Sequence, residues 1–504
     1  MTNPLHDALI APQIDRTDPL LITETGEISG AGFAAMSHRF AHALTGLGLK
    51  PGDRMAVQIQ KSAEALALYG AALATGVVFL PLNTAYTPDE VAYFVENAGA
   101  ALLVGDPAAA EVLEPVARRF GAGFQALDGA GQGSLADLAA GRPDSFDAVS
   151  RDRDDLAAIL YTSGTTGRSK GAMLTQANLL DNAQVLAEAW RFTDSDVLLH
   201  MLPIFHTHGL FVASNVSLLT GGKMIFLPGF SADRAIRWLP QATAMMGVPT
   251  FYTRLLDDPR FDRALSGHMR LFTSGSAPLL AETHRQFEER TGHRILERYG
   301  MTETNMSTSN PYDGERRAGT VGPALPGVEV RITDPETGEP LPQGTPGMIE
   351  VRGHNVFKGY WQMPEKTAEE LRPDGFFITG DIGVIDEAGY VTIVGRQKDL
   401  IISGGYNIYP KEIELLLDEQ PGVLESAVIG VPHPDFGEGV VAVIVPAPGG
   451  EPKPAELEAA ISSRLARFKQ PKRYVVQDVL PRNTMGKVQK NLLRERFKDS
   501  FRQS

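Results

Sequence analysis

Segments with helical periodicity alternate with short apolar runs from about residue 30 to residue 395 of this 504-residue chain. Residues 33–48, for example, have the spacing of an amphipathic helix that ends in glycines, and residues 54–60 then read as a strand. Repeated alternation of this kind predicts mainly parallel sheets flanked by helices. The Gly-rich segment 129–143 interrupts the pattern, and we expect it to be a surface connection. Because the chain is too long for one core of ordinary size, we expect an α/β protein with at least two domains.

The pattern changes twice toward the C-terminus. Between about residues 320 and 395, short β-type runs are separated by turn signals such as TDPETGEP at 333–340, which predicts a small antiparallel, barrel-like sheet. The order of patterns is then strand, helix, two strands and helix, which predicts a compact α+β unit. We therefore divide the chain into a large N-terminal domain, residues 1–395, and a small mobile C-terminal domain, residues 396–504. We expect the short polar junction at 394–399 to act as a hinge.

The charge and the cysteine content exclude several classes of protein. A net charge of -14 argues against nucleic acid or an anionic membrane as the main partner, because either would repel the chain. The sequence has no cysteine, so disulfides, thiolate metal sites and cysteine nucleophiles are excluded, and any reacting thiol must come from a substrate. No apolar stretch approaches the roughly 18 residues of a membrane span, and the N-terminus lacks a secretion signal pattern. We therefore expect a cytoplasmic protein.

The strongest local signal is the segment YTSGTTGRSKG at residues 161–171, which lies between a strand-like run and a helix opened by Thr175. Glycines and hydroxyl side chains at this density predict a loop that wraps a polyphosphate with backbone N–H and hydroxyl donors, while Lys170 supplies positive charge. The spacing does not match the Walker pattern, so this is not an ordinary P-loop. The alternative interpretation is a flexible solvent loop. The predicted nucleotide contacts in this segment are Thr162, Ser163, Gly164, Thr165, Thr166, Gly167 and Lys170.

Two further strand-like runs end in polar residues. Residues 269–275 lead into GSAPL at 275–279, and residues 294–300 lead into MTE at 301–303. The carboxyl ends of parallel strands meet at one edge of a sheet, where α/β proteins bind ligands. The sequence therefore predicts a nucleotide pocket at this edge.

These segments belong to an ordered set of motifs that extends over nearly the whole chain. The set comprises YTSGTTGRSKG at 161–171, PIFHTHG at 203–209, GSAPL at 275–279, YGMTE at 299–303, TGD at 379–381, GRQKD at 395–399, SGGYNIYP at 403–410 and PRNTMGKVQK at 481–490. On these motifs the chain resembles the adenylate-forming superfamily of acyl-CoA synthetases, carrier-protein adenylation domains and luciferases, from about residue 25 to residue 495. The resemblance implies an enzyme that makes an acyl adenylate from ATP and an acid and then transfers the acyl group to coenzyme A.

The resemblance implies roles for the nucleotide-binding residues. Tyr299 stacks on the adenine, Thr302 contacts the α-phosphate, and Glu303 holds Mg2+, which offsets the charge that spreads as pyrophosphate leaves. Asp381 and Arg396 bind the two ribose hydroxyls. Without the resemblance, Glu303 would be read as a helix-start carboxylate and Arg396 as a surface ion-pair residue. The other implied nucleotide contacts are Gly275, Ser276, Ala277, Pro278, Glu297, Arg298, Gly300 and Met301.

Lys487 lies in a glycine-containing segment near the C-terminus, where an exposed solubilising lysine would be the ordinary interpretation. The resemblance implies instead that its ammonium bridges the attacking carboxylate and the α-phosphate, two anions that otherwise repel each other. Acetylation would remove this charge, so we expect it to stop adenylation. A lysine acetyltransferase and a deacetylase are therefore candidate regulatory partners.

Thioester formation requires Lys487 to leave the site, so the resemblance implies a rotation of the C-terminal domain about Lys398. Glycine lets backbone approach the pantetheine of coenzyme A closely. The implied coenzyme A contacts are Gly404, Gly405 and Tyr406. His206 is implied to gate the acyl pocket, although a lone histidine is more often a core residue, and we interpret His208 as structural.

Arg254 is the candidate for recognising the acid. It falls on a predicted helix after a strand-like run, and its guanidinium is suited to grip the second carboxylate of a small diacid. The alternative is an ion pair with Asp257 or Asp258 on the same helix. HTHGLFVASN, TSGSAPL and ERYGMTETNM, together with Arg254, closely resemble the malonyl-CoA synthetases, which implies malonate as the acid. The implied acid contacts are Arg254, Thr207, Ser276 and Met306.

Three alternatives stay open. The enzyme could ligate another small acid, such as methylmalonate, acetate or an aromatic acid. It could load a carrier protein in trans rather than free coenzyme A. A catalytically inactive nucleotide-binding or scaffold protein is disfavoured, because Glu303, Asp381, Arg396 and Lys487 are all present.

Overall fold

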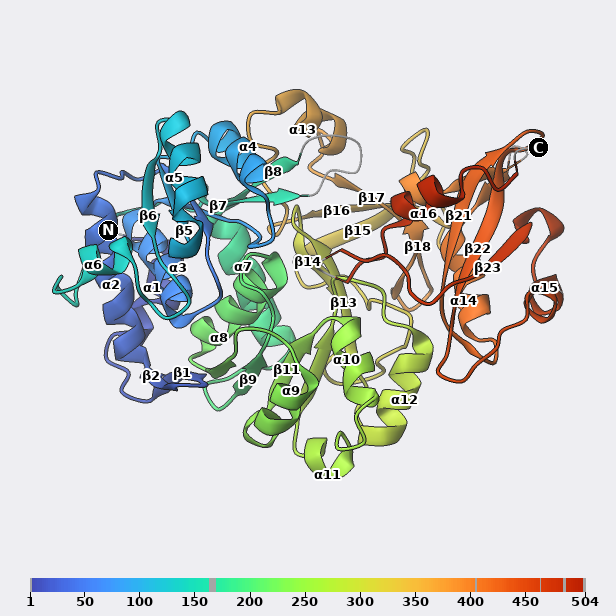
Figure 1. Cartoon of the computed structure of the whole chain (residues 1–504), viewed down its shortest axis with the longest axis horizontal. Coiled ribbons are helices and arrows are strands. Elements are labelled where there is room, and N and C mark those ends of the chain that lie inside the picture. The colour runs from blue at the N-terminus through green and yellow to red at the C-terminus, as the bar shows by residue number, and fades with distance from the viewer. Residues whose placement is uncertain (1, 163–168, 404–405, 463, 484–485, 502–504) are drawn as a thin grey trace.

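The computed structural model describes residues 2–162, 169–403, 406–462, 464–483 and 486–501. Figure 1 shows two helix-covered sheets in the N-terminal part, a small sheet in the middle of the molecule and an α+β unit at the C-terminal end. No helix within these described ranges is long and apolar enough to cross a membrane.

A six-stranded, mainly parallel sheet carries the glycine-rich motif. Its order is β6–β5–β3–β4–β7–β8, and β7 and β8 form its antiparallel pair. The strands are β3 (Arg54–Gln58), β4 (Val78–Pro81), β5 (Leu102–Gly105), β6 (Gly123–Ala126), β7 (Leu156–Thr162) and β8 (Lys170–Thr175). The β7–β8 register sets Lys170 opposite Thr162, so the two ends of the motif lie side by side.

An eight-stranded sheet carries the other predicted strand ends. Its order is β14–β13–β12–β11–β9–β10–β1–β2, with antiparallel pairs at both edges and parallel neighbours between them. The strands are β1 (Pro19–Thr23), β2 (Gly26–Ser29), β9 (Val197–His200), β10 (Lys223–Phe226), β11 (Ala244–Gly247), β12 (Leu271–Ser274), β13 (Leu296–Met301) and β14 (Asn305–Ser309). Because β12 and β13 are parallel neighbours, the segments that follow them share one edge, as predicted.

Successive strand residues face two different cores, because side chains alternate across a sheet. Leu198 and Met246 point into the core between the two sheets, whereas Leu199 and Met245 point into the core on the outer face of the eight-stranded sheet. Helix α3 (Ala63–Thr75) is buried along its whole length in the shared core. These two-faced apolar strands explain the near-continuous apolar runs in the sequence.

Several helices begin at residues whose side chains satisfy free N–H groups of the first turn. Thr87 and Glu90 form a reciprocal capping box at the start of α4, and Thr175 caps α7 as predicted. The helices of the N-terminal part are α1 (Pro4–Leu9), α2 (Gly30–Gly46), α3, α4 (Pro88–Ala98), α5 (Ala110–Arg119), α6 (Ser134–Ala139), α7 (Gln176–Ala189), α8 (Asn215–Thr220), α9 (Ala232–Trp238), α10 (Pro249–Leu256), α11 (Arg263–Ser266), α12 (Ala281–Thr291) and α13 (Pro364–Glu370).

One expectation about this part was incomplete. The segment 129–143 is not only a connection, because it contains helix α6. Leu135 and Ala139 lie four residues apart on one face of α6 and are buried in the shared core. Tertiary packing thus stabilises a short helix in a sequence that is rich in glycine.

A four-stranded antiparallel sheet follows, as the turn signals predicted. Its strands, in spatial order, are β15 (Val328–Thr333), β16 (Gly347–Gly353), β17 (Phe377–Ile385) and β18 (Val391–Arg396). The register of β17 and β18 places Asp381 directly opposite Arg396. This sheet lies between the N-terminal sheets and the C-terminal unit (Figure 1).

The C-terminal residues build hydrophobic cores of their own, for example around Ile413 and Leu417 of α14 and Val428 of β21. The strands of this C-terminal unit are β19 (Ile401–Ser403), β20 (Tyr406–Ile408), β21 (Val423–His433), β22 (Gly437–Pro446) and β23 (Arg473–Val476). Its helices are α14 (Pro410–Asp418), α15 (Pro454–Ser462) and α16 (Lys490–Phe497). The α+β character of this unit is as predicted. The boundary between residues 395 and 396 stays a prediction.

Candidate functional site

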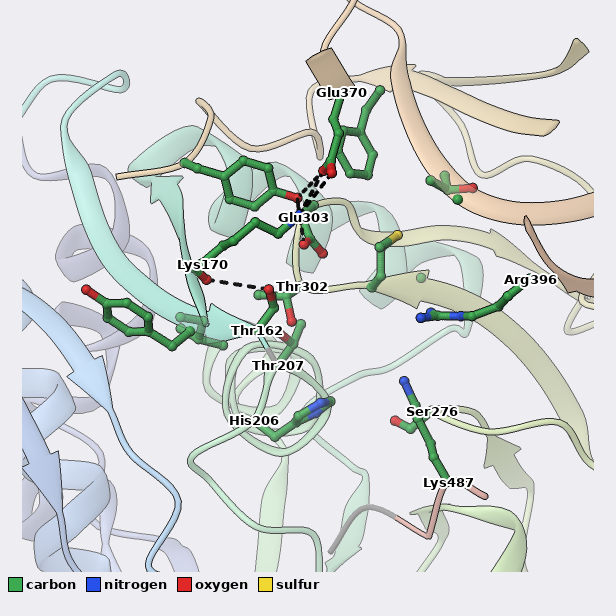
Figure 2. A pocket seen from close by; sticks show the side chains of 18 of the residues that line it. Thr162, Lys170, His206, Thr207, Ser276, Thr302, Glu303, Glu370, Arg396 and Lys487 are labelled. Atoms are coloured by element: carbon green, nitrogen blue, oxygen red, sulfur yellow. Dashed lines mark hydrogen bonds and ion pairs between the residues drawn. The ribbon is translucent and has the colours of Figure 1, made fainter. Parts of the chain in front are cut away.

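A cavity of about 940 Å3 lies where the strand ends of the N-terminal sheets meet the four-stranded sheet and the segment around Lys487 (Figure 2). Motifs that are far apart in the sequence thus contribute to a single site. The predicted site residues that line it are Thr162, Lys170, His206, Thr207, Ser276, Arg298, Gly300, Met301, Thr302, Glu303, Met306, Arg396, Lys398 and Lys487.

Other predicted site residues do not line this cavity. Those within the described ranges are Gly275, Ala277, Pro278, Glu297, Tyr299, Asp381, Arg254 and Tyr406. A further seven fall outside the described residues: Ser163, Gly164, Thr165, Thr166, Gly167, Gly404 and Gly405.

Tyr299, Asp381 and Arg396 form a chain of polar contacts beside the cavity. The Tyr299 hydroxyl donates to Asp381 Oδ2 at 2.7 Å, and Arg396 Nε lies 2.8 Å from Asp381 Oδ1. Burial raises the pKa of Tyr299, and Asp381 raises the pKa of Arg396, so the phenol stays neutral and the guanidinium stays charged. Arg396 is the member that points into the cavity (Figure 2).

Lys170 is held by two residues that the sequence did not single out. Its Nζ lies 3.0 Å from Glu370 Oε1 and 3.1 Å from the Tyr360 hydroxyl, which in turn donates to Glu370 Oε2 at 2.6 Å (Figure 2). Tyr360 reaches Lys170 because the backbone on both sides of it bonds to β8, where Trp361 N–H donates to Gly171 O at 2.7 Å. No local signal identifies Glu370, which is 200 residues from its partner.

Glu303 is the buried carboxylate of the cavity. It lies in the turn between β13 and β14, and the Tyr360 hydroxyl oxygen lies 3.0 Å from its Oε1. Burial raises its pKa, although the Tyr360 hydrogen bond and Lys170 oppose the shift. Among the described residues, no group of three or more histidines and acids could hold a metal ion alone. A lone carboxylate suits Mg2+, which keeps several waters and is usually shared with substrate phosphates.

Arg298 places an uncompensated cation in the cavity wall. Its side chain is 3% exposed, and its Nε and Nη2 have no hydrogen-bond partner among the described residues. Burial lowers the pKa of Arg298 to about 9, which still leaves it charged at neutral pH. Gly275 makes room for it, since a Cβ at this position would lie 2.4 Å from the guanidinium. A glycine is therefore required at position 275 to accommodate the buried guanidinium of Arg298.

The π-helix η3 (His208–Ser214) begins at the cavity, and His208 together with the two residues before it contributes polar side chains to the lining. His206 and Thr207 precede it, and His208 Nδ1 lies 3.3 Å from Ser276 Oγ. Burial, with Lys487 and Arg298 nearby, lowers the pKa of His206 to about 3, so this imidazole is neutral at neutral pH. Ser276 has a φ of 69°, a left-handed conformation that is uncommon for serine and is typical of functional sites.

Lys487 enters the cavity from the C-terminal side and points toward Arg396 and Ser276 (Figure 2). The cavity leaves its side chain exposed, while protein surrounds the ammonium on most sides. That burial, together with Arg396 and Lys398, lowers the pKa of Lys487. Lys398 lies in the short turn η5 (Gln397–Asp399), and burial also lowers its pKa. A surplus of cations at this end of the cavity favours an anionic ligand.

Arg254, Tyr406 and Glu297 lie away from the cavity lining. Arg254 is on α10, as predicted, but it is exposed near the C-terminal end of the helix. Of its two predicted alternative partners, Asp258 pairs with Arg260 at 2.6 Å. Tyr406 is exposed, with its ring stacked on Phe468. Glu297 is buried, 3.3 Å from His284 Nδ1, and accepts a backbone N–H.

Comparison with known proteins gives two family matches along this chain. Residues 11–361 match the AMP-binding enzyme family, and residues 412–487 match the AMP-binding enzyme C-terminal domain. Malonate–CoA ligase of Arabidopsis thaliana is 37% identical over 483 residues, which cover 89% of this chain and 79% of the relative. Feruloyl-CoA synthase of an Amycolatopsis species is 37% identical over 477 residues, covering 92% of this chain and 94% of that one.

Solved structures give the same picture. MatB from Rhodopseudomonas palustris with ATP bound is 57% identical, covers 100% of both chains and superimposes with a TM-score of 0.97. The apo form of the same protein gives a TM-score of 0.88. The arrangement seen here therefore lies nearer to that of the ATP-bound structure.

Proposed function

Since the chain belongs to the AMP-binding enzyme family, we propose that it ligates malonate to coenzyme A through malonyl-AMP, giving malonyl-CoA, AMP and pyrophosphate. The observation that carries the proposal is one cavity in which Lys487, Arg396 and the uncompensated Arg298 face Glu303. Cations at this density suit a ligand with both phosphates and carboxylates. Similarity to the malonate–CoA ligase of A. thaliana and to MatB supports the choice of reaction and acid.

In the first half-reaction, a carboxylate oxygen of malonate attacks the α-phosphorus of ATP, the bond to the β-phosphate breaks, and pyrophosphate leaves. Lys487 reaches the cavity beside Arg396 and is placed to lie between the two reacting anions. Thr302 directly follows strand β13 at the cavity, and its hydroxyl donates a hydrogen bond to the α-phosphate. Fixed donors of this kind act where charge develops in the transition state.

Glu303 would hold the Mg2+ that accompanies ATP. When bound, the ion offsets the charge on the leaving pyrophosphate. Lys170 lies on the same side of the cavity, 3.0 Å from Glu370, and is available to the phosphates once they displace that carboxylate. Tyr360 connects the two acids through its hydroxyl and fixes the direction of the Glu303 side chain.

In the second half-reaction, the thiol of coenzyme A attacks the acyl carbon, the bond to the AMP oxygen breaks, and AMP leaves while the thiol proton goes to solvent. Lys487 must first leave the cavity, and we propose a rotation about Lys398 for this step. His206 would act as the gate. Its lowered pKa keeps it neutral, so it can move past Lys487 and Arg298 without adding a third positive charge.

The second carboxylate of malonate identifies the acid. Arg298 is buried at the cavity wall near Ser276, and a carboxylate would supply the partner that its Nε and Nη2 lack. Thr207 and Met306 line the same cavity and would bound the methylene. The role of Arg254 stays a prediction, since this residue lies outside the lining.

The acid is tested by pyrophosphate release and coenzyme A thioester formation across malonate, methylmalonate, acetate, propionate, succinate and ferulate, without added carrier protein. We expect malonate to give the highest kcat/KM. Arg298→Met should lose roughly 100-fold with malonate and far less with propionate, because only malonate leaves an unpaired carboxylate. Arg254→Met is the matched comparison. Equal losses of Arg298→Met on both acids would remove the proposed carboxylate contact.

Higher activity with ferulate would place the chain with the feruloyl-CoA synthases instead. Adenylation of malonate without transfer to free coenzyme A would favour a carrier protein as the acceptor. Acetylation of Lys487 is expected to stop the first half-reaction only, so pyrophosphate release should be lost while thioester formation from chemically prepared malonyl-AMP persists.

A further inference from the structure

The segment that carries Lys487 is stabilised by its own polar contacts. Lys487 N–H donates to Asn483 Oδ1 at 2.9 Å, and Arg482 Nη1 donates to Gly486 O at 2.6 Å. Arg482 and Val488 form an antiparallel bridge across the turn. These contacts fix the shape of the described part of the turn, but they do not fix its position on the C-terminal unit.

Arg482 provides an attachment to the C-terminal sheet before Lys487. Its Nη2 pairs with Glu425 of β21. Glu425 is largely buried, with 20% of its side chain exposed, and burial raises its pKa while Arg482 lowers it. The same guanidinium therefore bonds both the turn and the sheet.

Lys490 provides an attachment after Lys487. Its Nζ lies 2.5 Å from Glu414 Oε1 of α14, and Val428 N–H of β21 donates to the same carboxylate at 2.9 Å. Lys411 lies 3.7 Å from the other oxygen. Burial alone would raise the pKa of Glu414, but Lys490 and Lys411 outweigh it and the pKa lies below its usual range. Glu414 is therefore a buried anion with two cations and a backbone donor.

Partly and fully buried ion pairs contribute little to stability, because the cost of removing the charges from water cancels much of the attraction. Such pairs do, however, fix the orientation of the segments that they connect. One pair attaches the segment to strand β21 and the other attaches it to helix α14, at residues within five positions of Lys487 and one on each side of it in the sequence. This placement favours a role in aiming Lys487.

We propose that Glu414 and Glu425 are positioning residues for adenylation, which hold the turn so that Lys487 reaches the cavity. The inference rests on the role proposed for Lys487. Because Lys487 takes no part in the transfer to coenzyme A, the two carboxylates matter for the first half-reaction and not for the second.

The test separates the two half-reactions in the full-length enzyme. Adenylation is followed by malonate-dependent exchange of pyrophosphate into ATP, and transfer is followed by thioester formation from chemically prepared malonyl-AMP and coenzyme A. The variants are Glu414→Gln, Glu425→Gln and Lys490→Gln. The matched control is Glu412→Gln on the same helix, whose carboxylate pairs with Lys469 at 2.8 Å and does not contact the Lys487 segment.

We expect each of the three variants to lose adenylation by roughly 10- to 100-fold, as misplacement of a catalytic group does, with transfer and the control unchanged. Lys490→Gln leaves Glu414 with Lys411 and Val428, so it decides the case if Glu414→Gln fails to fold. Equal losses in both half-reactions, or no loss of adenylation, would overturn the inference.

The variant Lys487→Ala separates a failure of the positioning role from a failure of the role proposed for Lys487. If Lys487→Ala retains adenylation, the role of Lys487 is wrong. If Lys487→Ala loses adenylation and the three variants do not, only the positioning role is wrong.

Discussion

The two sides of the cavity are held in different ways. On the N-terminal side, Glu303 and Arg298 are buried at the ends of a sheet whose two faces are covered by separate hydrophobic cores. On the C-terminal side, Lys487 is carried by a turn that is attached to strand β21 through Arg482 and to helix α14 through Lys490. A side built on sheet cores keeps its shape through the reaction, whereas a side held by a small domain can leave it. In the proposed mechanism, the N-terminal side therefore binds the substrates throughout, and the C-terminal side serves adenylation alone.

Lys487→Ala should show the largest effect. If this cation stabilises the transition state as proposed, its removal should lower the rate of adenylation by roughly 100- to 1,000-fold, with little change in transfer from malonyl-AMP. Rapid-quench measurement of AMP formation and a separate transfer assay check this. A similar loss in both steps would break the assignment of Lys487 to one half-reaction.

Glu370→Gln should show a smaller effect, confined to the N-terminal side. Glu370 lies 3.0 Å from Lys170 in the half-buried pair, so in the proposed mechanism it competes with phosphate for this lysine. Removing its charge should lower KM for ATP by roughly 2- to 10-fold, in line with the modest worth of partly exposed pairs, and leave KM for malonate unchanged.

Glu369→Gln is the matched control for this prediction, because Glu369 is on the same helix and pairs with Lys366 at 2.8 Å rather than with Lys170. Steady-state kinetics at varied ATP decides between two roles for Glu370. An increase in KM for ATP would show that Glu370 positions Lys170 instead of competing for it.

Asp418→Asn should give the smallest effect, on stability alone. Burial raises the pKa of Asp418 from 3.8 to about 7, although Lys411 and Ser426 oppose it. The folded form thus binds a proton that the unfolded form releases, and the wild type loses stability as the pH rises from about 4 to about 7. The variant lacks this loss. The difference in free energy of unfolding between the variant and the wild type should therefore grow with pH in favour of the variant and reach roughly 1 to 4 kcal/mol at pH 8.

Thermal unfolding of the variant and of the wild type at pH 5 and pH 8 measures this difference. An advantage of equal size at both pH values would show that the Asp418 carboxyl is not the titrating group.

The sequence identified the parts of the site that are encoded locally. Thr302, Glu303 and Lys487 stand in motifs whose neighbours define the turn that presents them, so their place in the cavity was predictable. Glu370 was not, because its contact with Lys170 depends on the packing of a segment 200 residues away. Arg254 shows an intermediate case. Its helix was predicted, but the helix buries Tyr252 and Leu255, so Arg254 is on the exposed side.

Secondary structure followed the same rule. The parallel strands and the C-terminal α+β pattern were readable, because each strand carries its own apolar run. Strand β8 was not predicted, because its first two residues, Lys170 and Gly171, belong to the glycine-rich motif, whose composition predicts a loop. It forms because β7 offers an edge on one side and the segment around Tyr360 pairs on the other.

The central claim is that malonate attacks the α-phosphate of ATP in this cavity. Malonate with 18O in its carboxylates tests this most directly, because the oxygen that bonds to phosphorus stays with AMP when the thiol displaces it. Mass spectrometry of the products should find one 18O in each AMP and none in pyrophosphate. AMP without 18O, or 18O in a phosphate released from the other end of ATP, would contradict the adenylate mechanism.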